Sequence, residues 1–66
     1  MIKNIELYEN NGIKIMLIKW WQGSLKSFDV DYYEDNIKIR EKSDDFPSLT
    51  DARRYYNKLL KEEKQK

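Results

Sequence analysis

Carboxylates are the side chains with which this chain could do chemistry, because its sequence contains neither histidine nor cysteine. Four of them stand close together, at Asp29, Asp31, Glu34 and Asp35. Asp29 and Asp31 share one face of a strand, and a hard cation needs oxygen ligands that are brought together in this way. An intact ion-binding loop, however, carries more ligands in a fixed register. We therefore interpret this segment as a solvated strand face, and we predict no metal, no cofactor and no enzymatic activity.

The composition narrows the class of protein further. Without cysteine and histidine, the chain cannot form disulfides, zinc fingers or thiolate sites. Thirteen Lys and Arg against twelve Asp and Glu leave a net charge of +1, so no overall field attracts nucleic acid or an anionic membrane. The longest apolar run, 15–18, is too short to span a membrane, and residues 1–4 lack the apolar stretch of a signal peptide. We expect a cytoplasmic protein.

The elements that must position these side chains are four strands and a helix. Apolar residues that alternate or run continuously predict strands at 2–8, 13–21, 28–32 and 37–40. The Asn11-Gly12 pair is typical of a tight hairpin. Pro47 cannot donate to a ladder, so we expect the loop at 43–47 to end the sheet. These features predict an antiparallel β-meander.

Alternation in the third and fourth strands predicts which side chains face the core. The residues expected to point inward are Phe28, Val30, Tyr32, Ile37 and Ile39. Those expected to point outward are Asp29, Asp31, Tyr33, Lys38 and Arg40. We expect the two carboxylates to meet the two basic residues across the hairpin, where opposite charges contribute modestly to stability.

A helix follows the sheet. Ser48 and Asp51 form the pattern of a capping box, in which a hydroxyl and a carboxylate satisfy free amides at the helix start. An apolar stripe that can pack on the sheet follows at Leu49, Ala52, Tyr56 and Leu59. The charged segment 61–66 has no apolar anchor, and we expect it to fray. The chain is thus predicted to be one α+β domain, 1–66, of four antiparallel strands and one C-terminal helix (ββββα).

The second strand is the unusual feature, because residues 15–18 are all apolar, so both faces of the strand are apolar there. A single helix can cover only one face of a sheet. Either the sheet curls or bulges so that these residues bury one another, or a partner covers the outer face. We favour another protein or a second copy of the chain, as a homodimer. The outward set of this strand is either Met16, Ile18 and Trp20 or Ile15, Leu17 and Trp21, so one of the two tryptophans must point away from the helix. The candidate binding residues are Tyr8, Met16, Ile18, Trp20, Trp21, Tyr33, Lys38 and Arg40.

Single-stranded nucleic acid is the alternative partner. Aromatic side chains on the outer face would stack on bases while Lys19, Lys38 and Arg40 contact phosphates. A secondary basic patch on the helix, at Arg53, Arg54, Lys58 and Lys61, would add to this. Asp29 and Asp31 oppose the interpretation, because two carboxylates on the same face repel a phosphate chain.

Several resemblances are limited to pattern. The order of four strands and a helix resembles the PUR-repeat single-stranded nucleic-acid-binding domains in coarse topology. Residues 46–56, Phe-Pro-Ser-Leu-Thr-Asp-Ala-Arg-Arg-Tyr-Tyr, are similar to the strand-to-helix junction of phage-integrase arm-binding domains and of WGR domains. The segment 20–23, Trp-Trp-Gln-Gly, departs from the Trp-Gly-Arg of the latter, and no function is carried over. The composition resembles small proteins of phages and mobile elements, which implies a defence inhibitor or host-factor binder.

Overall fold

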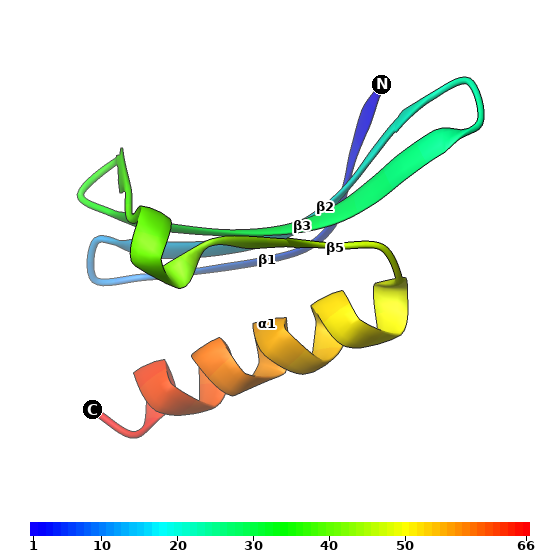
Figure 1. Ribbon diagram of the computed structural model, residues 1–66. Coiled ribbons are helices and arrows are strands. Elements are labelled where there is room, and N and C mark those ends of the chain that lie inside the picture. Colours follow the sequence, from blue (N-terminus) through cyan, green and yellow to red (C-terminus); the bar gives the residue numbers. More distant parts are fainter.

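The computed structural model describes residues 1–66 as a curved antiparallel sheet with one helix packed on one face (Figure 1). The elements are β1 (Ile2–Asn10), β2 (Ile13–Gln22), β3 (Leu25–Glu34), β4 (Ile37–Lys38), β5 (Asp44–Phe46) and α1 (Leu49–Lys64). The strands follow chain order from β1 to β4, and β5 pairs with β3. The predicted α+β class, an antiparallel meander followed by one helix, is confirmed. Helix α1 does not have the length and apolar composition of a membrane-spanning segment.

Two tight turns lie side by side at one end of the sheet. Asn11 and Gly12 have φ angles of 49° and 82°, and Asp35 and Asn36 have 51° and 69°. Positive φ at both central residues is the geometry of a type I′ hairpin, as the Asn-Gly pair predicted. The Asp35 amide donates to the Gly12 carbonyl at 2.8 Å, and a Cβ on Gly12 would lie 2.7 Å from Asp35 Oδ1. The φ of 82° favours glycine at this position, and any other residue would also force the Asp35 side chain to move.

The last part of the sheet differs from the prediction. A strand through Arg40 is wrong, because β4 ends at Lys38, a 3₁₀ turn covers Arg40–Lys42, and β5 then pairs with β3 where a loop was expected. The reason is Ser43, whose hydroxyl accepts from the Tyr32 amide at 3.0 Å and donates to the Ile39 carbonyl at 2.9 Å. These side-chain bonds replace the ladder, so that the strand is interrupted and then resumes.

This interruption also changes which residues reach the core. Ile37 was expected to face inward, and it is 66% exposed. Ile39 does pack against the core, as predicted. Phe46 replaces Ile37, since it lies opposite Phe28 in the register and its ring centre is 5.5 Å from that of Tyr55.

The core lies between β2, β3 and α1. Its eight buried apolar residues are Ile15, Leu17, Phe28, Val30, Tyr32, Ala52, Tyr56 and Leu59. The sheet contributes alternate residues and the helix contributes residues spaced by three and four, because side chains repeat every two residues in a strand and every 3.6 in a helix. The predicted inward faces of β3 and α1 are confirmed at these positions.

The helix has a clear anchor at each end. The Ser48 hydroxyl accepts from the Asp51 amide at 3.3 Å, whereas the Asp51 carboxylate lies 3.7 Å from Arg54 instead of reaching back. At the other end, the Tyr32 hydroxyl donates to Glu63 Oε1 at 2.5 Å. The helix therefore continues to Lys64, beyond the point at which fraying was expected, because a hydrogen bond rather than an apolar residue holds its last turn.

Candidate functional site: the outer face of the sheet

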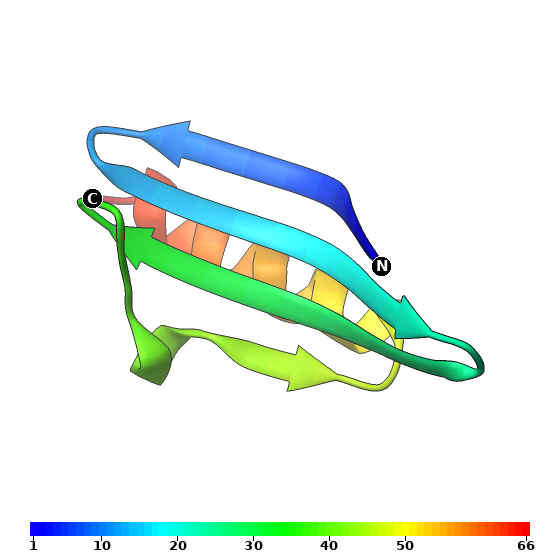
Figure 2. The same ribbon diagram turned by 90° about the horizontal axis from the view of Figure 1, so that it is seen from above.

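The strand β2 has one face on the helix and one face without cover. Ile15 and Leu17 are completely buried toward α1. Because neighbours in a strand point to opposite faces, Met16, Ile18 and Trp20 lie on the other side of the sheet, where they are partly exposed. Figure 2 looks onto this side, with α1 behind the sheet. We call it the outer face.

The neighbouring strand β1 extends this apolar surface. Leu7 lies opposite Met16 and Ile2 lies opposite Trp20 in the register, and residues paired in this way share a face. Their exposed fractions are 53% for Leu7 and 66% for Ile2. We define the apolar patch as Ile2, Leu7, Met16, Ile18 and Trp20.

A bulge in β1 creates this arrangement. The register shifts between Asn4 and Glu6, which leaves Ile5 packed against the core while Leu7 faces outward. Glu6 then pairs with Arg53 on the helix. A regular strand would put Ile2 on the same face as Glu6, so the extra residue is what brings Ile2 to the outer face.

A row of carboxylates borders the apolar patch. Asp31 lies opposite Met16, Asp29 lies opposite Ile18, and Asp45 lies opposite Asp29. These three aspartates, which we call the carboxylate row, do not form a group able to hold a metal ion. Two polar contacts partly balance the row: Lys38 Nζ is 3.4 Å from Asp31 Oδ1, and the Ser27 hydroxyl donates to Asp29 at 2.6 Å.

Asp45 responds to the neighbouring carboxylates, and the charge of Lys38 offsets only part of their effect on its pKa. Burial raises the pKa of its carboxyl above the ordinary value, and the nearby charges of Asp29 and Asp31 raise it further. Asp31 itself is only 9% exposed. The row is therefore a partly desolvated acidic strip in which a positive charge from outside would be stabilised.

The predicted binding residues separate into three groups. Those on the outer face are Met16, Ile18, Trp20, Tyr33 and Lys38. Those on the helix side are Tyr8, which lies opposite the buried Ile15, and Trp21, which lines a pocket with Leu49. Arg40 lies in the 3₁₀ turn. Trp20 is thus the tryptophan that points away from the helix. The placement of Tyr8 on the outer face was wrong, and Arg40 lies beyond the end of β4, where it lines a hollow with Lys38 and Asp45.

Two further expectations are corrected by the register. Lys19 lies on the helix side, since its ammonium is within 6.0 Å of the Phe28 ring. Asp29 faces Asp45 and not Arg40. Tyr33 is on the outer face as expected, but Lys14 Nζ lies 5.1 Å from the centre of its ring and occupies that surface.

The basic patch on the helix is only partly free. Arg53 pairs with Glu6 and Arg54 lies near Asp51. Lys58 and Lys61 are exposed and in no ion pair.

Fold and surface together define a small α+β domain whose sheet is covered by a helix on one face and is apolar and acidic on the other. Comparisons with protein-family models, curated proteins and solved structures found no match for this chain. The surface itself is therefore the basis for a functional argument.

Proposed function

We propose that this protein is a non-catalytic binding protein that recognises another protein through the outer face of its sheet. The observation that carries the proposal is the apolar patch, with Leu7 and Ile2 more than half exposed beside Met16, Ile18 and Trp20. Exposed apolar surface that is contiguous and rimmed by charge is typical of protein interfaces.

The carboxylate row indicates the charge of the partner. Asp29 and Asp45 face each other, and the pKa of Asp45 is raised by its burial and its acidic neighbours. A Lys or Arg placed over the row would relieve this repulsion while apolar side chains cover the patch. The partner that fits is an apolar protein surface flanked by basic residues.

A second copy of the chain fits less well. If two copies pair by a two-fold axis with their apolar patches in contact, each carboxylate row needs a basic residue of the other copy. The lysines of the outer face are already engaged within the chain, Lys38 with Asp31 and Lys14 with the Tyr33 ring. We therefore favour a different protein over a homodimer.

Single-stranded nucleic acid is also less well supported than a protein. Tyr8 and Lys19, two of the residues this function would use, lie on the helix side. Two aspartates of the row stand opposite Met16 and Ile18, where they would repel a phosphate chain.

The test is affinity purification from cells that make the protein, with nuclease treatment and matched surface variants. Leu7→Thr combined with Trp20→Thr removes most of the exposed patch and keeps residues that favour strands. Ile37→Thr is the matched control, because Ile37 is as exposed as Ile2 but lies outside the patch. We expect wild type and Ile37→Thr to capture the same protein and the double variant to lose it. Capture that the double variant retains, or capture of nucleic acid that nuclease removes, would contradict the proposal.

A further inference from the structure

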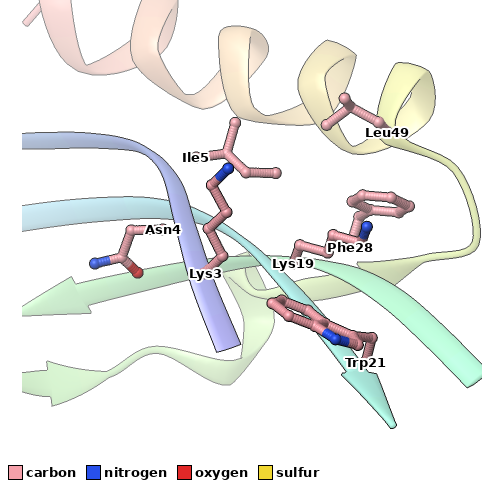
Figure 3. Close-up of a pocket in the computed structure, with 7 residues that line it drawn as sticks. All are labelled: Lys3, Asn4, Ile5, Lys19, Trp21, Phe28 and Leu49. Carbon is pink, nitrogen blue, oxygen red and sulfur yellow. The ribbon is translucent and has the colours of Figure 1, made fainter. Parts of the chain in front are cut away.

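A second surface, on the helix side of the sheet, has the composition of a small-molecule site. The β2–β3 hairpin bends away from the start of α1 (Figure 1), and a pocket of about 650 Å³ lies in this region. Seven residues line it: Lys3, Asn4, Ile5, Lys19, Trp21, Phe28 and Leu49 (Figure 3). None of them belongs to the apolar patch or to the carboxylate row.

Two lysines from adjacent strands stand together in this pocket. Lys3 and Lys19 are directly opposite in the β1–β2 register, and like charges in such a pair destabilise a sheet. The ion pairs of the chain involve Lys38, Arg53, Arg54 and Lys66, so neither lysine has a carboxylate partner. The positive charge is therefore uncompensated within the chain.

Aromatic and apolar side chains form the rest of the pocket. Lys19 Nζ lies 5.3 Å from the centre of the Trp21 ring and 6.0 Å from that of Phe28. Leu49, on the opposite wall, is the first residue of α1, and the amino end of a helix adds a partial positive charge. The pocket thus combines a flat apolar surface with an electropositive rim.

We propose that this pocket binds small molecules that carry a carboxylate or phosphate group on a flat aromatic body. The anion would lie between the ammonium groups of Lys3 and Lys19 and would relieve their repulsion. The ring would pack against Trp21, Phe28 and Leu49. This site is separate from the outer face and does not depend on the function proposed for that face.

The two tryptophans allow a test with an internal control. In nuclear magnetic resonance titrations, 2-naphthoate and 2-naphthyl phosphate should shift the indole N–H signal of Trp21, which lines the pocket. The indole signal of Trp20, on the opposite face, should stay unchanged. The neutral analogue 2-naphthylmethanol should bind about fivefold more weakly, because it cannot form the ion pairs.

Lys3→Gln combined with Lys19→Gln should weaken binding of both anions about fivefold and remove their preference over the neutral analogue. Lys14→Gln combined with Lys61→Gln removes the same charge elsewhere. It should leave the affinity for the anions and their preference over the neutral analogue unchanged. The first variant should be at least as stable as wild type to urea, because it removes a pair of like charges. Equal shifts of both indole signals, equal affinity for the neutral analogue, or unchanged anion binding by the folded Lys3→Gln, Lys19→Gln variant would each overturn the proposal.

Discussion

The two faces of β2 carry similar side chains in different surroundings. Ile15 and Leu17 are completely buried against Tyr56 and the other apolar residues of α1. Met16 and Ile18, one position along, lie on a face that no other element covers. The hydrophobicity of the strand is thus the same on both sides, and only the cover differs. A strand that is apolar on both faces therefore indicates, from sequence alone, that something packs on each face. Which element packs on which face depends on the fold.

The charges on the two faces show the same contrast. On the helix side, Glu63 accepts from Tyr32 and Glu6 pairs with Arg53, so each carboxylate has a partner in the chain. On the outer face, Asp29 and Asp45 face each other and neither is in an ion pair, although Ser27 donates a hydrogen bond to Asp29. The carboxylates Glu6 and Glu63 thus stabilise the helix side, whereas the outer face keeps an unfavourable arrangement of carboxylates of the kind that binding sites retain.

The largest change in the free energy of unfolding is expected when a side chain beneath the helix is truncated. Leu17→Ala should lower the free energy of unfolding by about 3 kcal/mol, because it leaves a cavity in the core. Leu7→Ala, on the outer face, should lower it by less than about 1 kcal/mol, since Leu7 is already 53% exposed. Urea denaturation measures both. Equal losses would mean that the outer face is packed like a core.

The hydrogen bond that holds the last turn of the helix should have the next largest effect. Tyr32→Phe should lower the free energy of unfolding by about 1–2 kcal/mol, because Glu63 loses a charged hydrogen bond. Tyr33→Phe is the control on the outer face and should change it by less than about 0.5 kcal/mol. If both variants unfold at the same urea concentration as wild type, the hydrogen bond does not stabilise the domain.

The pH dependence of this difference should identify its source. The hydrogen bond from Tyr32, together with Lys66, lowers the pKa of Glu63 from its ordinary value of 4.5. The contribution is therefore complete above pH 4.5 and is lost as the pH falls through the lowered pKa. Burial and Glu63 raise the pKa of Tyr32 above its ordinary value of 10.0, so stability should also fall as the pH rises above 10.

These two losses can be followed by urea denaturation between pH 3 and 11. The difference between wild type and Tyr32→Phe should be greatest near neutral pH and should shrink at both ends. A difference that stays constant across this range would mean that packing, and not the Tyr32–Glu63 bond, explains the effect of the substitution.

The smallest effect is expected at the carboxylate row, and its sign is opposite. Asp45→Asn should raise the free energy of unfolding at pH 7 by about 0.5 kcal/mol, because an amide replaces a carboxylate that faces Asp29. The raised pKa of Asp45 means that this gain should disappear as the pH falls toward 3.8, where the wild-type carboxyl is protonated. The same variant should weaken binding of a basic partner. Destabilisation at pH 7 would show that the row is a stabilising network.

The sequence predicted the features that depend on the spacing of nearby apolar residues or on a short turn motif. Alternation in β3, the Asn11-Gly12 turn and the apolar stripe of α1 were all read correctly. The continuous apolar run of β2 predicted that one of two sets faces outward, either Met16, Ile18 and Trp20 or Ile15, Leu17 and Trp21. The structure then resolved which tryptophan faces outward.

The features that were missed depend on single side chains acting over a distance. No periodic signal marks the bulge that turns Ile5 inward and Leu7 outward, so the β1 part of the patch was not predicted. The hydroxyl of Ser43 interrupts the ladder, and Asp44 and Asp45 next to Pro47 resemble a turn more than a strand. Glu63 was assigned to a frayed end because its partner, Tyr32, is distant in sequence.

The most direct test of the outer face as a binding surface is selection of a random peptide library on the immobilised protein, followed by affinity measurements on the selected peptides. The account predicts sequences that combine apolar residues with Lys or Arg. Their binding should weaken at least tenfold in Leu7→Thr with Trp20→Thr, should weaken in Asp45→Asn, and should be unchanged in Ile37→Thr. Selected peptides rich in Asp and Glu, or peptides that bind the Leu7→Thr, Trp20→Thr variant as tightly as wild type, would contradict it.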